Sequence, residues 1–211
     1  MAVVKNLYGD GEVIVPALTW VSDIASILQN NLKPKFVDID LDTLSMTSEN
    51  LEKKINKKTR AIFITHAQGF NGFNKNFFEI IKNFKIPIIE DVCESHGAKY
   101  KKKKLGTFGL ISNFSFYYAH HMSTIEGGMI CTNDRKIYEL CRMFRSHGLV
   151  REIESNKLKN KIIKKNKNLN PEFIFQVPGY NLRNNEISAI IGINQLKRLD
   201  LNIKKRNLNH S

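Results

Sequence analysis

The sequence predicts an α/β protein of three layers, α/β/α, in which helices cover both faces of a mainly parallel sheet. Short apolar runs such as 12–17, 61–66 and 86–89 recur along the chain. These runs are almost continuously apolar rather than alternating, which is typical of strands buried on both faces. Segments with apolar residues at helical spacing separate them, and this alternation favours βαβ units.

The individual elements follow from the same periodicities. Apolar runs that end at proline or acidic residues predict strands, and apolar residues three or four positions apart predict helices. We expect strands at 12–17, 35–40, 61–66, 86–89, 113–117 and 128–132, and helices at 20–30, 48–55, 76–84, 135–145 and 186–199. Four consecutive lysines at 101–104 predict an exposed turn. The segment 156–170 is rich in lysine and asparagine with little apolar periodicity, and we expect a surface loop there.

Size and composition narrow the class of protein. The chain has 211 residues, 42% of them hydrophobic, which argues for a folded domain rather than intrinsic disorder. No apolar run approaches the ~18 residues of a membrane-spanning helix, and residues 1–10 lack the apolar stretch of a signal peptide. Three cysteines without a CxxC pair, Cys93, Cys131 and Cys141, indicate neither a disulfide framework nor a zinc site. They favour a reducing, cytoplasmic location.

The formal net charge of +13 comes largely from lysine. One interpretation is a solvated, lysine-rich surface, and the other is attraction to anionic partners such as nucleotides or nucleic acid. The basic residues are not interleaved with aromatic residues, and no nucleic-acid-reading motif is present. We therefore expect neither a nucleic-acid partner nor a membrane partner.

Polar side chains that follow the predicted strands are the candidate site residues, because ligands of parallel sheets bind beyond the carboxyl ends of the strands. Asp91 is interpreted either as a helix N-cap or as an acid that pairs with a protonated ring nitrogen of a cofactor. Ser115 is either a strand hydroxyl satisfied by backbone or a phosphate ligand. His120 and His121 are adjacent and would point to opposite faces of an extended segment, so we expect no shared metal. A single histidine acting as an acid–base is the favoured interpretation.

Four segments, in order along the chain, carry a resemblance to a known family: GDGEVIVPALTW at 9–20, EDVCESHGA at 90–98, SFYYAHHMSTIEGG at 115–128, and GYNLR at 179–183. Together they resemble the DegT/DnrJ/EryC1/StrS sugar aminotransferases. The resemblance implies the large domain of pyridoxal-phosphate-dependent (PLP) fold type I. It also implies pyridoxal 5'-phosphate or pyridoxamine 5'-phosphate as the cofactor.

The resemblance assigns roles by position. Trp20 would stack on the pyridine ring of the cofactor, Asp91 would pair with its ring nitrogen, and Glu94 would support the side of its ring hydroxyl. Ser115 would bind its phosphate. Asn181 would reach the phosphate in the neighbouring subunit, which implies a homodimer with a shared active site.

One departure from the family pattern decides the expected reaction. Five residues after Ser115, where the aminotransferases carry the lysine that forms an imine with the cofactor, this chain has His120. The sugar 3-dehydratase branch of the family makes the same exchange. The resemblance thus implies non-covalent pyridoxamine phosphate, with His120 as the acid–base that removes the C3 hydroxyl of a nucleotide-linked 4-keto-6-deoxyhexose. Glutamate would be the amino donor, and the pathway would be deoxysugar and lipopolysaccharide O-antigen synthesis.

Residues 148–170 contain no cysteine, so the iron–sulfur branch of these dehydratases is not expected.

Length sets the expected domain organisation. Family members are considerably longer, so we expect 1–206 to be a large domain without its first elements, ending in the helix toward a small domain, with 207–211 as a tail. The nucleotide, GDP or CDP, stays open. The alternatives are a nucleotide-sugar aminotransferase-family member, or an inactive fragment that binds only cofactor or a partner.

Overall fold

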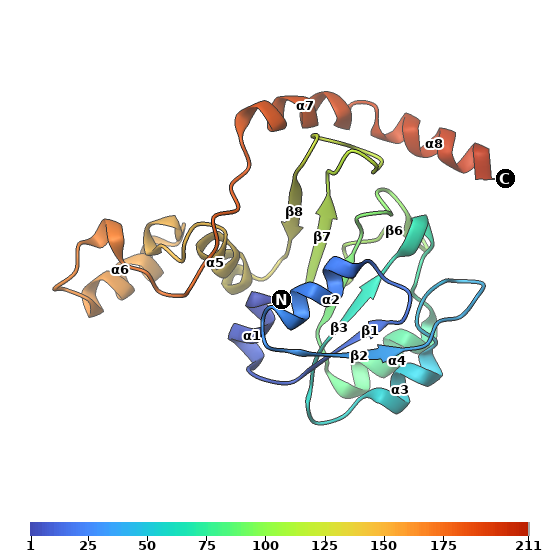
Figure 1. Cartoon of the computed structure of the whole chain (residues 1–211), viewed down its shortest axis with the longest axis horizontal. Helices are drawn as coiled ribbons and strands as arrows, with labels where there is room; N and C mark the ends of the chain where they lie inside the picture. Colours follow the sequence, from blue (N-terminus) through green and yellow to red (C-terminus); the bar gives the residue numbers. More distant parts are fainter. Residues whose placement is uncertain (211) are drawn as a thin grey trace. The chain divides into compact units, whose positions relative to one another are not determined.

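A computed structural model describes residues 1–210 (Figure 1). The chain divides into two compact units. We call Met1, Val3–Cys131 and Glu186–Ser211 the sheet unit, and Ala2 with Thr132–Asn185 the helical unit. Within the described residues, no helix combines the length and apolar character needed to cross a membrane.

The sheet unit is built on six strands in the order β2-β1-β3-β4-β7-β8. All neighbouring strands pair in parallel except β7 and β8, which are antiparallel. This arrangement, visible in Figure 1, confirms the predicted mainly parallel sheet. The bounds are β1 (Glu12–Pro16), β2 (Lys33–Val37), β3 (Thr59–Thr65), β4 (Ile88–Asp91), β7 (Ile111–Ser115) and β8 (Gly128–Cys131).

Helices in the connections between parallel strands bury apolar faces against the sheet. In α4, Phe77 and Ile80 are buried, and the Asn74 side chain caps the helix by accepting a hydrogen bond from the backbone N–H of Phe77 at 2.8 Å. The helices assigned to this unit are α1 (Ala2–Tyr8), α2 (Val21–Leu28), α3 (Ser48–Lys54), α4 (Lys75–Phe84), α7 (Glu186–Leu196) and α8 (Leu199–His210). The predicted helix at 186–199 is therefore two helices, and α8 continues through residues 207–210.

The turn predicted at the lysine run is confirmed. β5 (Lys99–Tyr100) and β6 (Lys103–Lys104) form a small antiparallel pair, and the two lysines between them make its turn. A short 3-10 helix, η1 (Ala67–Gly69), follows β3.

The helical unit contains α5 (Arg135–Phe144), η2 (Val150–Glu152), α6 (Asn156–Lys165) and η3 (Pro171–Phe173). The surface loop predicted at 156–170 is wrong for its first ten residues, which form α6. Ser155 starts this helix by accepting a hydrogen bond from the backbone N–H of Leu158, and lysine has a high helix propensity. Leu158 and Ile162, four residues apart, are half-buried, so the apolar spacing of a helix is present but sparse.

A buried carboxylate, Glu90, holds the end of β4 in place. Its side chain is fully buried and accepts hydrogen bonds from the backbone N–H groups of Gly106 at 2.6 Å, Phe108 at 2.7 Å and Gly109. His66 Nε2 lies 3.4 Å from Glu90 Oε2, and His66 Nδ1 accepts from the backbone N–H of Gly72, so Nε2 carries the proton. Three backbone donors therefore converge on one carboxylate, and the His66 imidazole lies beside it.

This network changes how Glu90 titrates. Burial raises its pKa, but the hydrogen bonds from His66 and from the backbone N–H groups outweigh burial and hold the pKa below the ordinary 4.5. A carboxyl with a lowered folded-state pKa stabilises the fold above about pH 4.5. That stability is lost as the pH falls through the folded-state pKa.

We predict that Glu90→Gln lowers the free energy of unfolding by about 2–4 kcal/mol, because the amide NH2 of glutamine would face a backbone N–H donor in a buried place. Urea unfolding at pH 7 measures the loss. Glu49→Gln is the matched control, because Glu49 is exposed in an i,i+4 pair with Lys53, and its loss should leave the free energy of unfolding nearly unchanged. Equal stability of the two variants would contradict the role given to Glu90.

Candidate active site

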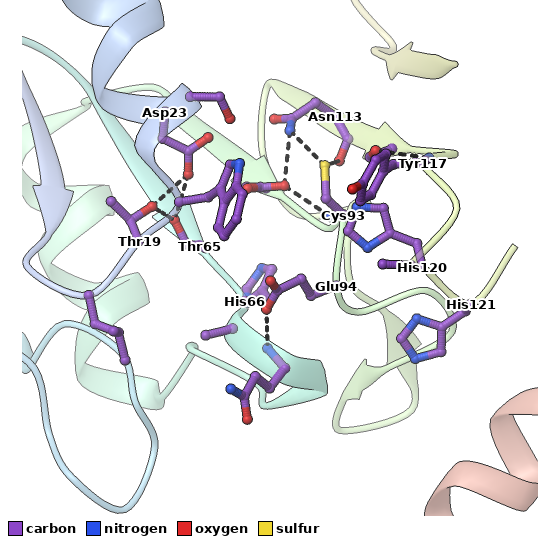
Figure 2. Close-up of a pocket in the computed structure, with 18 of the residues that line it drawn as sticks. Thr19, Asp23, Thr65, His66, Cys93, Glu94, Asn113, Tyr117, His120 and His121 are labelled. Atoms are coloured by element: carbon purple, nitrogen blue, oxygen red, sulfur yellow. Dashed lines mark hydrogen bonds between the residues drawn. The ribbon is translucent and has the colours of Figure 1, made fainter. Parts of the chain in front are cut away.

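A cavity of about 990 Å³ lies where the parallel strands end. It is lined by side chains that follow β1, β3, β4 and β7, all within the sheet unit, as expected for ligand sites of parallel sheets. Its size is that of a cofactor or small-molecule site. The lining residues include Leu18, Thr19, Trp20, Asp23, Thr65, His66, Gln68, Asp91, Cys93, Glu94, Asn113, Ser115, Tyr117, Ala119, His120, His121 and Arg206. Figure 2 draws most of the lining side chains and labels ten of them.

Asp91 is the last residue of β4 and is only 6% exposed. Its Oδ1 accepts from the backbone N–H of Cys93 at 2.9 Å and from Asn113 Nδ2 at 3.0 Å. Both donors are N–H groups that cannot accept a proton, so they favour the ionised carboxylate. No α-helix begins after Asp91, and its cap-like bond to Cys93 closes a turn instead.

Trp20 presents an aromatic face to the cavity. The residue precedes the first turn of α2, in an extended conformation, and remains 64% exposed. An indole left this exposed at the mouth of a cavity is available to stack on a planar ring.

Behind Trp20 lies a polar cluster that the sequence analysis did not single out. Asp23 Oδ2 accepts from Thr19 Oγ1 at 2.6 Å and from Thr65 Oγ1 at 3.0 Å, and the two hydroxyl oxygens are themselves 2.6 Å apart (Figure 2). Burial, and then the charge of Asp91, raise the pKa of Asp23 to about 7. The sequence could have revealed Asp23 by its position, because it comes three residues after Trp20, in the first turn of a predicted helix. A side chain in that turn points back toward the N-terminus of the helix and so toward the strand ends.

Glu94 and Ser115 are both held by backbone groups. Glu94 Oε2 accepts from the backbone N–H of Gln68 at 2.8 Å, and Gln68 has a left-handed conformation with φ of 51°. Ser115 ends β7, and its Oγ accepts from the backbone N–H of Tyr117 at 3.2 Å. Ser115 thus makes a backbone hydrogen bond, as expected for a strand hydroxyl satisfied by backbone. It also lines the cavity, as expected for a phosphate ligand.

The loop after β7 carries His120 and His121, and both line the cavity. The segment is a turn, not the extended strand assumed from the sequence, so the expectation that they face opposite sides is wrong. The His121 ring lies 5.6 Å from the buried His96 ring, centroid to centroid, and the His120 ring lies 6.3 Å from it. Burial, followed by neighbouring cationic groups, lowers the pKa of His96 and of His121 to about 4.

The charges around the cavity are uneven. Among the described residues that line it, none is lysine, and Arg206 of α8 is the permanent cation. Within residues 1–210, no group of three or more histidine, cysteine or acidic side chains is arranged to hold a metal ion. Cys93 also lines the cavity, and burial and the charge of Asp91 raise the pKa of its thiol, so the thiol stays protonated.

The structure therefore brings five of the six predicted site residues to one cavity, namely Trp20, Asp91, Glu94, Ser115 and His120. Asn181 lies in the helical unit, where it forms an isolated β-bridge with Ser146. Its predicted role concerned a neighbouring subunit, and that role stays a prediction.

Comparison with curated proteins gives a consistent result. The chain is 40% identical over 204 residues to a GDP-4-keto-6-deoxy-D-mannose 3-dehydratase of Escherichia coli O55:H7, covering 94% of this chain and 51% of that protein. It is 36% identical over 189 residues to a GDP-perosamine synthase of Escherichia coli O157:H7, covering 90% of this chain and 47% of that protein. The chain thus spans about half the length of the curated relatives it matches.

Solved structures agree. An E. coli GDP-4-keto-6-deoxy-D-mannose-3-dehydratase with bound hydrated PLP superposes with a TM-score of 0.81 at 35% identity, covering 94% of this chain and 52% of that one. A GDP-4-keto-6-deoxymannose-3-dehydratase with a trapped PLP-glutamate geminal diamine gives a TM-score of 0.78 at 36% identity, covering 90% of this chain and 49% of that one.

The two dehydratase structures match the sheet and its connections, so the fold is that of the large domain of the PLP-dependent fold type I enzymes. A family model described as the DegT/DnrJ/EryC1/StrS aminotransferase family matches residues 2–211. The chain belongs to the DegT/DnrJ/EryC1/StrS aminotransferase family.

Proposed function

We propose that the chain is the cofactor-binding portion of a pyridoxamine-phosphate-dependent nucleotide-sugar 3-dehydratase. The observation that carries the proposal is the cavity wall, where a histidine, His120, and no lysine among the described residues accompanies Trp20 and Asp91. The relatives named as GDP-4-keto-6-deoxy-D-mannose 3-dehydratases support the reaction, and the substrate would then be a GDP-linked 4-keto-6-deoxyhexose.

The residues present fit the cofactor. An exposed indole, Trp20, suits a planar ring, and the side chain of Asp91, oriented by two N–H donors, suits a protonated ring nitrogen. Ser115 offers a hydroxyl at another wall of the same cavity, which suits a phosphate. Glu94, fixed by the backbone of Gln68, would face the ring hydroxyl.

When bound, the cofactor would supply an amine for the sugar ketone and a ring that stabilises negative charge on its amine-bearing carbon, so that electrons can pass toward the sugar as the C3 hydroxyl leaves. His120 would move the protons. Its imidazole can accept a proton through one nitrogen and return it near neutral pH, whereas a lysine would form a covalent link to the cofactor. Asp91 would keep the ring nitrogen protonated throughout, and Trp20 would cover one face of the ring.

The partners follow from the same proposal. Glutamate would regenerate the amine form of the cofactor, in line with the PLP-glutamate adduct named for a related structure. The work of the enzyme would be surface polysaccharide synthesis in the cytoplasm, in line with a relative named as a lipopolysaccharide biosynthesis protein in Salmonella typhimurium. The protein would act as a homodimer, in which Asn181 reaches the partner's cofactor phosphate.

The surface of α7 supports self-association. Four of its apolar side chains are each at least 60% exposed, namely Ile187, Ile190, Ile193 and Leu196. At a spacing of three residues they wind around the helix, so α7 is apolar on several sides. Monomeric proteins rarely leave so much apolar surface of one helix in water.

We predict that His120→Asn abolishes glutamate-dependent dehydration of the GDP-linked 4-keto sugar, by at least about 100-fold, because the acid–base group is lost. The assay uses the natural protein, purified from the cells that produce it. His147→Asn is the matched control, since His147 is exposed in a left-handed conformation that asparagine adopts readily. Full activity of His120→Asn, with cofactor bound, would refute the role of His120.

We predict that pyridoxamine phosphate quenches the intrinsic tryptophan fluorescence, because Trp20 is the single tryptophan of the chain. Trp20→Phe should weaken binding by less than Trp20→Ala, which we expect to weaken it roughly tenfold, the equivalent of a stacking contact of ~1.4 kcal/mol. Equilibrium dialysis measures both variants. Leu41→Ala, at an exposed position in a loop, is the control that should bind as the wild type does.

We predict that Ile190→Lys shifts the protein from dimer to monomer in sedimentation velocity, because a charge would be placed in the exposed apolar surface of α7. Leu41→Lys, an equally drastic change at an exposed apolar residue outside α7, should leave the dimer intact. A wild type that sediments as a monomer at every concentration would contradict the proposed homodimer.

A further inference from the structure

Two acids share the wall of the cavity behind Trp20. Asp23 comes from the first turn of α2 and is 5% exposed, while Asp91 comes from the end of β4. The two acids are close neighbours, because Thr65, which donates a hydrogen bond to Asp23, is the register partner of Asp91 across β3 and β4. Two ionised carboxylates buried as neighbours repel each other, which favours a proton on one of the pair.

The donors around each acid show where the proton is held. Asp91 receives two N–H groups, which can only donate and so favour its ionised form. Asp23 instead faces the hydroxyl groups of Thr19 and Thr65, which can turn to accept as well as donate. A hydroxyl environment tolerates a neutral carboxyl, and a pair of N–H donors does not.

A proton count in the threonine cluster agrees. Asp23 Oδ2, Thr19 Oγ1 and Thr65 Oγ1 form a triangle with oxygen–oxygen distances of 2.6, 3.0 and 2.6 Å. The two hydroxyls bring two protons to three short contacts. If Asp23 is ionised, one contact therefore lacks a proton, and a protonated Asp23 adds a donor to the cluster.

The other charged and titratable groups near Asp23 do not replace this proton. Asp91 of β4 faces it directly, and Cys93, which follows β4, is a protonated thiol. The other titratable and charged groups of the same wall are His66 after β3, Glu94 after β4, Tyr117, His120 and His121 after β7, and Arg206 of α8. None of these groups forms an ion pair with Asp23 within the described residues.

We propose that Asp23 is a positioning residue for Asp91, holding a proton in the threonine cluster beside it so that the pair carries one negative charge and that charge lies on Asp91. Asp23 would thus set the strength of the anion that faces the cavity. The part of the proposal that concerns a bound cofactor rests on the proposed function. The proton held on Asp23 does not.

The raised pKa of Asp23 makes the stability of the fold and the charge of the cavity wall depend on pH. Burial and the Asp91 charge raise the pKa of Asp23 to about 7, well above its unfolded value of 3.8. The folded state therefore binds a proton that the unfolded state has lost between about pH 4 and 7, so stability from this group falls as the pH rises through that window and is lowest above it. Above pH 7 the cavity wall gains a second negative charge. A cation seated against Asp91 would ease that second ionisation.

Infrared spectroscopy of the cofactor-free chain tests the proton on Asp23 directly. At pH 6, where ordinary carboxyl groups are ionised, we expect a protonated-carboxyl band in the wild type that fades by pH 8.5. Asp23→Asn, which resembles the protonated acid in shape, should lack the band, and Asp42→Asn, at an exposed carboxylate, should keep it. A wild type without the band, or Asp23→Asn with an unchanged band, would overturn the proposal.

A second variant keeps the test decisive if Asp23→Asn does not fold. Asp91→Asn removes the charge that holds the proton on Asp23, so the midpoint of the band should move to lower pH. An unmoved midpoint would show that the charge of Asp91 does not hold the proton on Asp23, and would overturn the proposal. In thermal unfolding, the melting temperature of Asp23→Asn should exceed that of the wild type by about 3 °C or more at pH 8.5, and by less at pH 5.

Cofactor binding separates the two proposals. The dissociation constants of pyridoxamine phosphate for the wild type and Asp23→Asn should be nearly equal at pH 5.5. At pH 8.5 the wild type should bind several-fold more tightly, because its pair is then doubly charged opposite a ring cation. An equal ratio at both pH values would overturn the role of Asp23 in setting the anion. No binding to either protein, with the infrared band intact, would refute the cofactor proposal and leave the acid pair standing.

Discussion

The cavity depends on one buried carboxylate that never faces it. Glu90 lies one residue before Asp91 on β4, so its side chain points to the opposite face of the sheet. There it gathers backbone N–H groups from the turn at 106–109 and the imidazole of His66. These contacts fix the end of β4 against the end of β3 and against the turn that leads into β7. Asp91 is consequently presented to the cavity from a strand end that cannot shift without breaking a buried ionic network.

Electrostatics inside the cavity follow from which donors each acid receives. Glu90 and Asp91 both receive N–H groups, and these favour the charged form. Asp23 receives hydroxyls and lies in a buried position beside an existing negative charge, which favours the neutral form. Neighbouring carboxyl groups in one wall therefore take different protonation states because α2, β3 and β4 bring different donors to them.

The sequence was sufficient to predict the parallel sheet and most of the cavity wall, because both depend on local patterns. Buried parallel strands are continuously apolar, and Asp91 and Ser115 stand at their ends. Three features were out of reach of such patterns. The Asp23 cluster depends on which way one helical side chain turns, the His120 loop bends where it was expected to extend, and α6 has an apolar stripe too sparse to recognise among lysines.

The order of the cavity residues along the chain has a consequence for how the site is made. Apart from Arg206, every residue that lines the cavity lies between Leu18 and His121, on successive strand–helix units. During synthesis the chain emerges from its N-terminus, and such units can fold as they appear. The cavity wall would then be nearly complete before the helical unit leaves the ribosome, so a nascent chain can already carry the surface that meets the cofactor.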